Sequence, residues 1–256
     1  MTLLEKISRS NIYLYLLSKY LYQNFLYKFF FEQEFKILKH LENHSKRSII
    51  DIGSNSGVSA RSIRIFDKNS KIISFEPNKS FLKKLKNTQK KINNFKFYLY
   101  GGYNKKKISH LYVPYFNNYC LDAQASVEKK FVLDSVGRGI FHKGIIKKIS
   151  IKKILCKFVK IDDFKLKPYF IKIDTEGSEH LVLEGLINTI KNYKPVIMVE
   201  KNDINFFRVK KFLAKNGYNI FSFQGENLKK YVFKKRDHLN LICIHKKNFY
   251  LNFCFK

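Results

Sequence analysis

The segment Asp51–Gly57 (DIGSNSG) places an acid, two glycines and small polar residues at a spacing that suits ligand binding. It has the form D-x-G-x-x-x-G, in which Gly53 and Gly57 would let a ligand approach the backbone, with Ser54 and Asn55 beside it. The pattern differs from the G-x-G-x-x-G turn of dinucleotide sites, and its carboxylate would repel a pyrophosphate. That carboxylate would attract an ammonium group such as the one in S-adenosylmethionine, which has no phosphate. The alternative is an ordinary glycine turn after a strand.

A second acid, Glu76, ends the next apolar run (Lys71–Glu76) and is followed by Pro77. In doubly wound sheets an acid at this place accepts hydrogen bonds from ribose hydroxyls. Glu76 lies 25 residues after Asp51, close to the interval of about 20 that such sites show. We therefore predict a nucleoside site at Glu76 and Pro77; the alternative is a surface carboxylate.

A third group of polar residues, Asp174, Glu176 and Gly177, follows the apolar run 169–173. Ligand sites in open α/β sheets lie at the carboxyl ends of strands, so these carboxylates are expected to face the same crevice as Asp51. Capping of the next helix is the alternative, but it explains Glu179 and not Asp174. A divalent cation held by these two acids and Glu200 is conceivable, since hard cations prefer carboxylates. The spacing does not demand it, and we predict no metal.

The elements that must position these residues follow a strand–helix–strand order. Apolar runs and helical spacing predict strands at 46–51, 71–76 and 95–100, with helices at 58–66 and 79–91 between them. Further strands are expected at 169–174, 195–200, 218–223, 231–234 and 239–245, and helices at 179–191 and 203–216. This order predicts a doubly wound α/β fold whose sheet is mostly parallel with right-handed crossovers.

Between these two halves lies a less regular part of the chain. Residues 108–113 predict a short strand, 155–161 an edge strand, and 114–150 a loop insertion over the site. Aromatic residues in Tyr112–Tyr119 would pack on the apolar face of a sugar ring, while asparagines bind its hydroxyls. Equally, the loop would be held on the domain by its own aromatic side chains.

Residues 1–45 are expected to form a helical extension to a domain at 46–256. Leu14, Leu17, Leu21, Phe25 and Phe29 recur at helical spacing, but polar residues interrupt the run, which argues against a transmembrane span. We predict that this helix packs on the domain or on a second subunit, which would make a homodimer. The alternative is a peripheral helix in a membrane interface.

The chain has a formal net charge of +30, with only seven arginines among its 50 basic residues. Nucleic-acid sites favour arginine for bidentate contacts, and the lysines are scattered, so we do not expect a nucleic-acid partner. The four cysteines form no C-x-x-C pair. They are typical of a reduced cytoplasmic protein, and the first ten residues lack the features of a secretory signal.

Four segments resemble the FkbM family of methyltransferases: DIGSNSG (51–57), SFEPN (74–78), VKIDDF (159–164), and IKIDTEGSEHLVLEG (171–185) continuing to KPVIMVE (194–200). The resemblance implies a Rossmann-like class I methyltransferase fold with an antiparallel last strand. It also implies S-adenosylmethionine as the donor and, usually, O-methylation. By position, Asp51, Gly53, Asn55 and Gly57 would line the methionine part and Glu76 would hold the ribose. After the third strand the family usually has a small-apolar pair where this chain has Gly101, Gly102 and Tyr103; we assign Gly101 to the adenine side.

We therefore predict transfer of a methyl group to a hydroxyl of a sugar, a glycan or another small polar metabolite. A hydroxyl acceptor must lose its proton as the new bond forms. Asp174 is the predicted base and Glu176 orients the acceptor, with His180 as the rival base. The alternatives are a nucleic-acid methyltransferase, supported only by charge, and a non-catalytic nucleotide-binding relative.

Overall fold

A twisted sheet of eight strands forms the centre of the computed structural model, which describes residues 11–41, 47–121, 124–137, 143–224, 227–233 and 240–248. The strand order is β11-β10-β12-β9-β8-β1-β2-β3. The strands are β1 (Ser48–Ile52), β2 (Lys71–Phe75), β3 (Phe95–Tyr98), β8 (Pro168–Ile173), β9 (Val196–Glu200), β10 (Tyr218–Gln224), β11 (Asn227–Lys230) and β12 (Asn240–His245). The five strands from β9 to β3 are parallel, and β12 is antiparallel to both of its neighbours. The predicted class I methyltransferase fold with an antiparallel last strand is confirmed.

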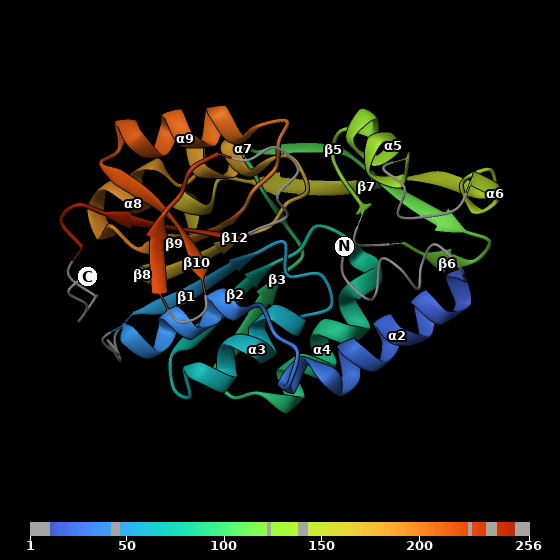
Figure 1. Ribbon diagram of the computed structural model, residues 1–256, viewed down its shortest axis with the longest axis horizontal. Helices are drawn as coiled ribbons and strands as arrows, with labels where there is room; N and C mark the ends of the chain where they lie inside the picture. The colour runs from blue at the N-terminus through green and yellow to red at the C-terminus, as the bar shows by residue number, and fades with distance from the viewer. Residues whose placement is uncertain are drawn as a thin grey trace.

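Helices cover both faces of this sheet (Figure 1). The side chains of Ile50, Ile52, Ile171 and Ile173 pack against α7 (Glu179–Glu184), α8 (Ile187–Tyr193) and α9 (Phe206–Lys215). Their neighbours Ile49 and Phe170 face the other side, where α3 (Val58–Phe66) and α4 (Leu82–Lys91) lie. Side chains alternate across a strand, so strands buried on both faces require the continuous apolar runs seen in the sequence.

The predicted helix 179–191 is divided into α7 and α8 at Gly185. A Cβ at this position would lie 2.0 Å from the carbonyl oxygen of Tyr103. The backbone of the loop after β4 (Gly101–Gly102) therefore crosses the helix where only glycine fits. The strand predicted at 231–234 is also misplaced, because β11 ends at Lys230 and Tyr231 follows it. Lys234, and Leu239 at the start of the next predicted strand, lie outside the described residues.

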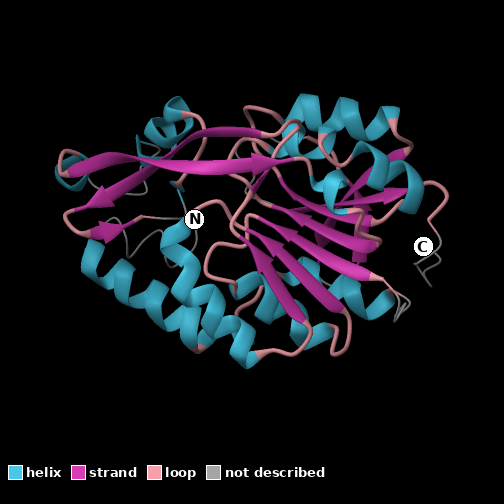
Figure 2. Ribbon diagram, turned by 180° about the vertical axis from the view of Figure 1, so that it is seen from behind, coloured by secondary structure: helices cyan, strands magenta, loops and turns pink. Residues whose placement is uncertain are grey.

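A second sheet has four strands in the order β4-β7-β5-β6. Both ends of the predicted insertion at 114–150 belong to strands of this sheet. Its core is an antiparallel pair of β5 (Lys107–Phe116) and β7 (Ile149–Val159), with β6 (Tyr119–Cys120) at the edge. The strand predicted at 155–161 overlaps β7, but the expectation of an edge strand was wrong, because β7 pairs with β4 on one side and with β5 on the other. The part of the chain between β6 and β7 forms two helices, α5 (Lys129–Gly137) and α6 (Lys143–Ile146). The prediction that 114–150 is a loop was therefore also wrong. Figure 2 shows the two long strands beside the main sheet.

The amino-terminal helix α2 (Ile12–Asn24) lies against the second sheet and next to α4 (Figure 1). It begins at Asn11, whose side chain accepts the backbone N–H groups of Tyr13 and Leu14. Ile12, Tyr15 and Leu16 face the domain, packing with Phe116 and Leu121. A short helical segment, Gln33–His40, then buries its apolar side chains in the core under α3.

The apolar residues that recur at helical spacing in the sequence of α2 lie on the opposite face of the helix from these contacts. Leu14, Leu17 and Leu21, together with Phe25 and Phe29, are exposed. The described helices include none long and apolar enough to cross a membrane. The second subunit and the membrane interface both stay predictions for this exposed stripe.

Candidate active site

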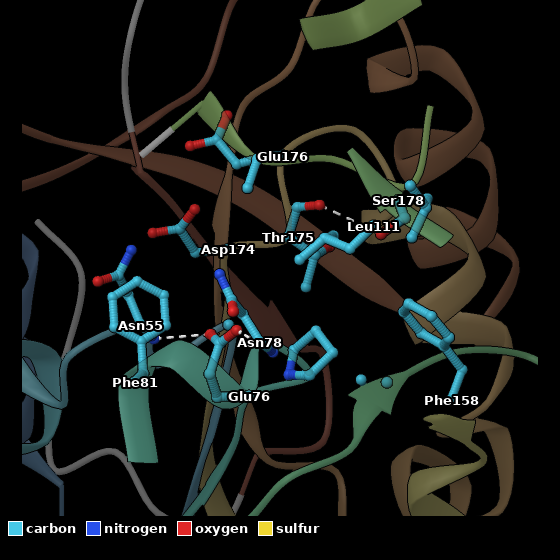
Figure 3. Close-up of a pocket in the computed structure, with 16 residues that line it drawn as sticks. Asn55, Glu76, Asn78, Phe81, Leu111, Phe158, Asp174, Thr175, Glu176 and Ser178 are labelled. Carbon is cyan, nitrogen blue, oxygen red and sulfur yellow. Dashed lines mark hydrogen bonds between the residues drawn. The ribbon is translucent and has the colours of Figure 1, made fainter. Parts of the chain in front are cut away.

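The carboxyl ends of four parallel strands carry Gly53, Glu76, Asp174 and Glu200. Glu76 and Asp174 face one another across the site in Figure 3. The backbone N–H of Gly53 donates to the Phe75 oxygen at 2.9 Å, and that of Asp174 donates to the Ile52 oxygen at 3.0 Å. Gly53 has a φ of 82°, and a Cβ there would lie 1.7 Å from the carbonyl oxygen of Asp174. The glycine therefore lets the first loop and the acidic loop touch, whereas the sequence predicted that a ligand would approach the backbone here.

Glu76 fastens the first loop to the end of β2. One carboxylate oxygen accepts the backbone N–H of Asn55 at 2.8 Å, and the other accepts that of Asn78 at 2.8 Å. The side chain is 6% exposed. Burial raises its pKa to about 7, although the two backbone donors oppose the shift. Glu76 is thus a structural acceptor for the protein as well as the predicted ribose acceptor.

Asp51 does not reach the pocket through its side chain. The carboxylate is fully buried and accepts the hydroxyls of Ser59 and Ser74 at 2.7 and 2.9 Å. It therefore ties the start of α3 to β2, below the loop that it precedes. Ser54 is also buried, and Gly57 takes a positive φ of 77° to begin α3. Of the segment Asp51–Gly57, only Gly53 and Asn55 line the cavity of the site.

One cavity joins the three predicted motifs (Figure 3). Its walls come from both sheets and include most of the predicted site residues. They are Gly53, Asn55, Glu76, Pro77, Asn78, Phe81, Gly101, Gly102, Leu111, Ala125, Val127, Phe158, Asp174, Thr175, Glu176 and Ser178. The insertion at 114–150 contributes Ala125 and Val127 to one wall, and the strands β5 and β7 on either side of it add Leu111 and Phe158.

The chemistry of this cavity fits a nucleoside ligand with polar ends. Among the described residues, the Asn55 Oδ1 and Asn78 Nδ2 atoms are buried and have no hydrogen-bond partner, which leaves one acceptor and one donor for a ligand. A Cβ on Gly101 would lie 2.4 Å from the Phe158 ring and 3.3 Å from the Pro77 Cβ. The glycine thus keeps open a narrow apolar slot that suits a flat adenine ring.

Hydrogen bonds to Glu179 shape the acidic loop. Its Oε1 accepts the backbone N–H groups of Thr175 and Gly177 at 3.0 and 3.1 Å, and the Thr175 hydroxyl at 3.1 Å. Its Oε2 accepts the Asn205 side chain at the amino end of α9. These bonds hold Glu176 at its positive φ of 51°. Glu179 thus fastens the loop that precedes α7 rather than capping the helix, and Asp174 and Glu176 are left to face the cavity.

Carboxylate oxygens of Asp174, Glu176 and Glu200 lie within 4.8 Å of one another. Such a group would attract a cation, but Lys172 already supplies one: its Nζ lies 2.7 Å from Asp174 Oδ2. Burial and the carboxylates of Glu176 and Asp174 raise the pKa of Glu200 well above its usual range. A proton on Glu200 would lessen the repulsion within this group of acids, and the absence of a metal stays a prediction.

His180 lies away from the cavity. It is 7% exposed, on α7, and its Nε2 lies 3.4 Å from the Arg208 guanidinium of α9. Burial and the Arg208 charge lower its pKa. A side chain packed toward α9 is poorly placed to be the rival base.

Sequence reasoning missed Lys172 and Asn205. Lys172 lies inside the apolar run that became β8, and a lysine flanked by Ile171 and Ile173 directly before an acid was the available signal. No local pattern indicates Asn205, whose bonds to Gly177 and Glu179 cross 28 and 26 residues.

Comparison with known proteins was made on sequence and on structure. The model of the methyltransferase FkbM domain matches residues 51–220. Methyltransferase FkbM from Methylobacillus flagellatus KT is similar in structure, with a TM-score of 0.52 and 16% identity over 84% of this chain. The chain spans 48% of that protein's length. No match was found among curated proteins.

Two further solved structures are more distant. Precorrin-6y C5,15-methyltransferase from Geobacter metallireducens GS-15 has a TM-score of 0.42 and 15% identity, over 85% of this chain and 88% of its own. A putative rRNA-methylase from Clostridium thermocellum has a TM-score of 0.45 and 11% identity, over 83% of this chain and 93% of its own.

The likeness to the Methylobacillus flagellatus protein shows the fold alone, and the domain model shows the family. That model covers well over half of the chain and includes each of the predicted motifs. The chain belongs to the FkbM family of methyltransferases, whose methyl donor is S-adenosylmethionine.

Proposed function

We propose that this chain transfers the methyl group of S-adenosylmethionine to a hydroxyl of a sugar, a glycan or another small polar metabolite. The observation that carries the proposal is a single cavity with Glu76 in one wall and the Asp174–Glu176 carboxylates in another. The first suits a nucleoside and the second a group that gives up a proton. The cavity is concave and partly apolar, as small-molecule sites are.

The roles of the donor-binding residues follow from their positions. Glu76 would accept the ribose hydroxyls, and Gly101 would admit the adenine between Pro77 and Phe158. Asn55 and the backbone at Gly53 would meet the methionine part. Asp51 would act only through the loop that it anchors, because Ser59 and Ser74 hold its side chain in the interior.

When bound, the donor supplies an activated methyl group, so the protein's task is mainly alignment and removal of the acceptor's proton. Asp174 faces the cavity and is the proposed base, with Glu176 beside it to orient the acceptor hydroxyl. Lys172 positions Asp174 from behind at 2.7 Å. Glu200 lies deeper, with its Oε2 buried and lacking a hydrogen-bond partner among the described residues, so it acts through the other two acids.

Calorimetric titration with S-adenosylmethionine, S-adenosylhomocysteine and NAD tests the donor. We expect both adenosyl ligands to bind and NAD to bind far more weakly, because the cavity offers carboxylates where NAD carries a pyrophosphate. Preference for NAD, or no binding of either adenosyl ligand, would overturn the proposed function.

Replacing Asp174 with asparagine tests the base. We expect kcat for methyl transfer to a hydroxyl acceptor to fall by a factor of about 10² to 10⁴ while the dissociation constant of S-adenosylhomocysteine stays unchanged. Transfer of labelled methyl to a panel of neutral and acidic sugars would be measured, with and without a chelator, which we expect to have no effect. Asp163→Asn, an exposed acid of the segment Ile161–Phe164, is the matched control. Full turnover in the Asp174 variant would exclude this role.

A further inference from the structure

A second cavity, of about 520 Å³, opens beside the first. It is bounded by α2, by α4 and by the turn between β5 and β6, which lie next to one another in Figure 1. Its lining residues are Leu16, Lys19, Tyr20, Gln23, Asn24, Ser56, Arg61, Ser80, Phe81, Lys84, Asn87, Thr88, Lys91, Asn118, Tyr119 and Cys120. Phe81 belongs to the walls of both cavities.

The charges around this second cavity all have one sign. Lys19, Arg61, Lys84 and Lys91 line it, and none of its lining residues is an acid. A net positive chain has many lysines on convex surface, where water screens them. Here four cationic side chains converge on one concavity, where their fields add, and Arg61 and Lys19 are at least partly shielded from water.

Burial and the nearby Lys84 charge lower the pKa of Lys19 to about 8, which reports the crowding of positive charge at this place. Burial likewise lowers the pKa of Lys84, and the Arg61 charge adds to that shift. An anion between these ammonium groups would relieve their mutual repulsion, and Lys19 would then hold its proton more firmly.

Hydrogen bonds from α3 and α4 to Gln23 of α2 hold the walls of this second cavity in place. Arg61 donates to the Gln23 carbonyl oxygen at 2.6 Å and lies 4.5 Å from the Tyr27 ring, so its role is to attach α2 to α3. Lys84 donates to the Gln23 side-chain oxygen at 3.0 Å. Lys19 and Lys84 therefore face one another from α2 and α4. Asn118 and Tyr119 complete the rim, and they belong to the segment in which the sequence predicted sugar contacts.

The acidic end of the donor cavity lies close to this cationic group. The Glu176 carboxylate interacts electrostatically with Lys19, and Asn55 and Ser56 are neighbours in the chain that line one cavity each. A ligand with a hydroxyl at Glu176 would therefore extend toward Lys19 and Lys84.

We propose that this second cavity binds a phosphate or carboxylate group of the methyl acceptor, so that the acceptor is an acidic sugar or a similar small anion. The inference rests on the proposed function. It predicts that a neutral sugar is a poor acceptor compared with its phosphorylated or carboxylated counterpart.

Calorimetric titration with inorganic phosphate and with glucose 6-phosphate, against glucose, tests this inference in the protein without donor. We expect both anions to bind and glucose to bind far more weakly, with affinity falling as salt rises. Lys84→Gln and Lys91→Gln should each weaken anion binding about tenfold, because each removes a charged hydrogen-bond donor. Lys83→Gln and Lys90→Gln are the matched controls: they make the same charge change on the same helix, are exposed, and do not line the cavity.

The outcomes separate this inference from the function on which it rests. Equal weakening by control and cavity variants, or no anion binding by a protein that binds S-adenosylhomocysteine, overturns the inference and leaves the proposed function intact. Anion binding without any adenosyl-ligand binding overturns the proposed function and the acceptor assignment together. Faster methyl transfer to glucose 6-phosphate than to glucose, lost in Lys84→Gln, supports both.

Discussion

Replacing Glu76 with glutamine is expected to weaken the binding of S-adenosylmethionine by a factor of about 10 to 100, the loss of one or two hydrogen bonds to a charged group. Each Glu76 carboxylate oxygen already accepts a backbone N–H at 2.8 Å. Their remaining lone pairs are the ones available to ribose hydroxyls. Glutamine offers a carbonyl oxygen on one side only, so its NH₂ would face the N–H of Asn55 or Asn78. The variant thus loses an acceptor for the ligand and disturbs the loop that lines the site.

Calorimetry on wild type and variant gives the ratio of dissociation constants. Glu184→Gln is the matched control, because Glu184 is exposed and accepts a single hydrogen bond, from Asn104, away from the cavity. An unchanged dissociation constant in Glu76→Gln would remove Glu76 from the donor site.

Wild type and Glu76→Gln should also differ in how their free energy of unfolding depends on pH. Burial raises the pKa of folded Glu76 to about 7, above the ordinary value of 4.5, so the folded protein holds a proton that the unfolded chain releases. The stability that this group contributes therefore falls as pH rises from about 4.5 to about 7. Glutamine does not titrate. The unfolding free energy of wild type minus that of the variant should thus fall by up to about 3 kcal/mol between pH 5 and pH 8. A difference independent of pH would contradict the buried-acid assignment.

The parallel half of the fold was predictable because its inner strands are buried on both faces. A run such as SIIDI or YFIKI has no other stable placement than the middle of a covered sheet, and the acid or glycine that follows it marks the carboxyl end. Local signals therefore sufficed to bring Gly53, Glu76 and Asp174 to one edge.

The second sheet was not predictable in the same way. Along β5 the side chains vary between exposed and buried without strict alternation, and its partner β7 lies more than 30 residues away in the chain. Pairing across such a distance depends on long-range register, which no local pattern in 114–150 records. The site wall made by Leu111 and Phe158 follows from that pairing, so it too was invisible.

The amino-terminal helix shows how an apolar pattern can mislead about orientation. Spacing identified Leu14, Leu17 and Leu21 as one face, and the structure leaves that face exposed. The packed face is formed by Ile12, Tyr15 and Leu16, with Lys19 directed to the second cavity. A helix that is apolar over most of its circumference has no single stripe that identifies its buried side.

Replacing Lys172 with methionine is expected to lower the free energy of unfolding by about 3–5 kcal/mol, the usual cost of removing one partner of a buried ion pair. Lys172 is 2% exposed, and its ammonium lies 2.7 Å from Asp174. Burial opposes its charge, but Asp174, Glu32 and Asp51 together raise its pKa above the usual range. Methionine keeps the length and the apolar stem of the side chain. The variant therefore isolates the charge, and it leaves the buried Asp51 and the half-buried Glu32 and Asp174 without their shared cation.

The loss of unfolding free energy in Lys172→Met should grow with pH. A lost charge gives such a pH dependence, whereas a lost packing contact does not. Burial already raises the pKa of Glu32 to about 7, and that of Asp51 upward as well, while Lys172 opposes both shifts. Without Lys172 both folded pKa values rise further above the unfolded values. The folded variant then binds extra protons at low pH and loses stability as pH rises through about 4.5 to 8. Urea unfolding at pH 5.5 and pH 8 measures the effect, with Lys157→Met on exposed β7 as the control. A loss below about 1 kcal/mol, or one that is equal at both pH values, would mean that Lys172 serves only to fill space, and that the acids around the site hold their charges without it.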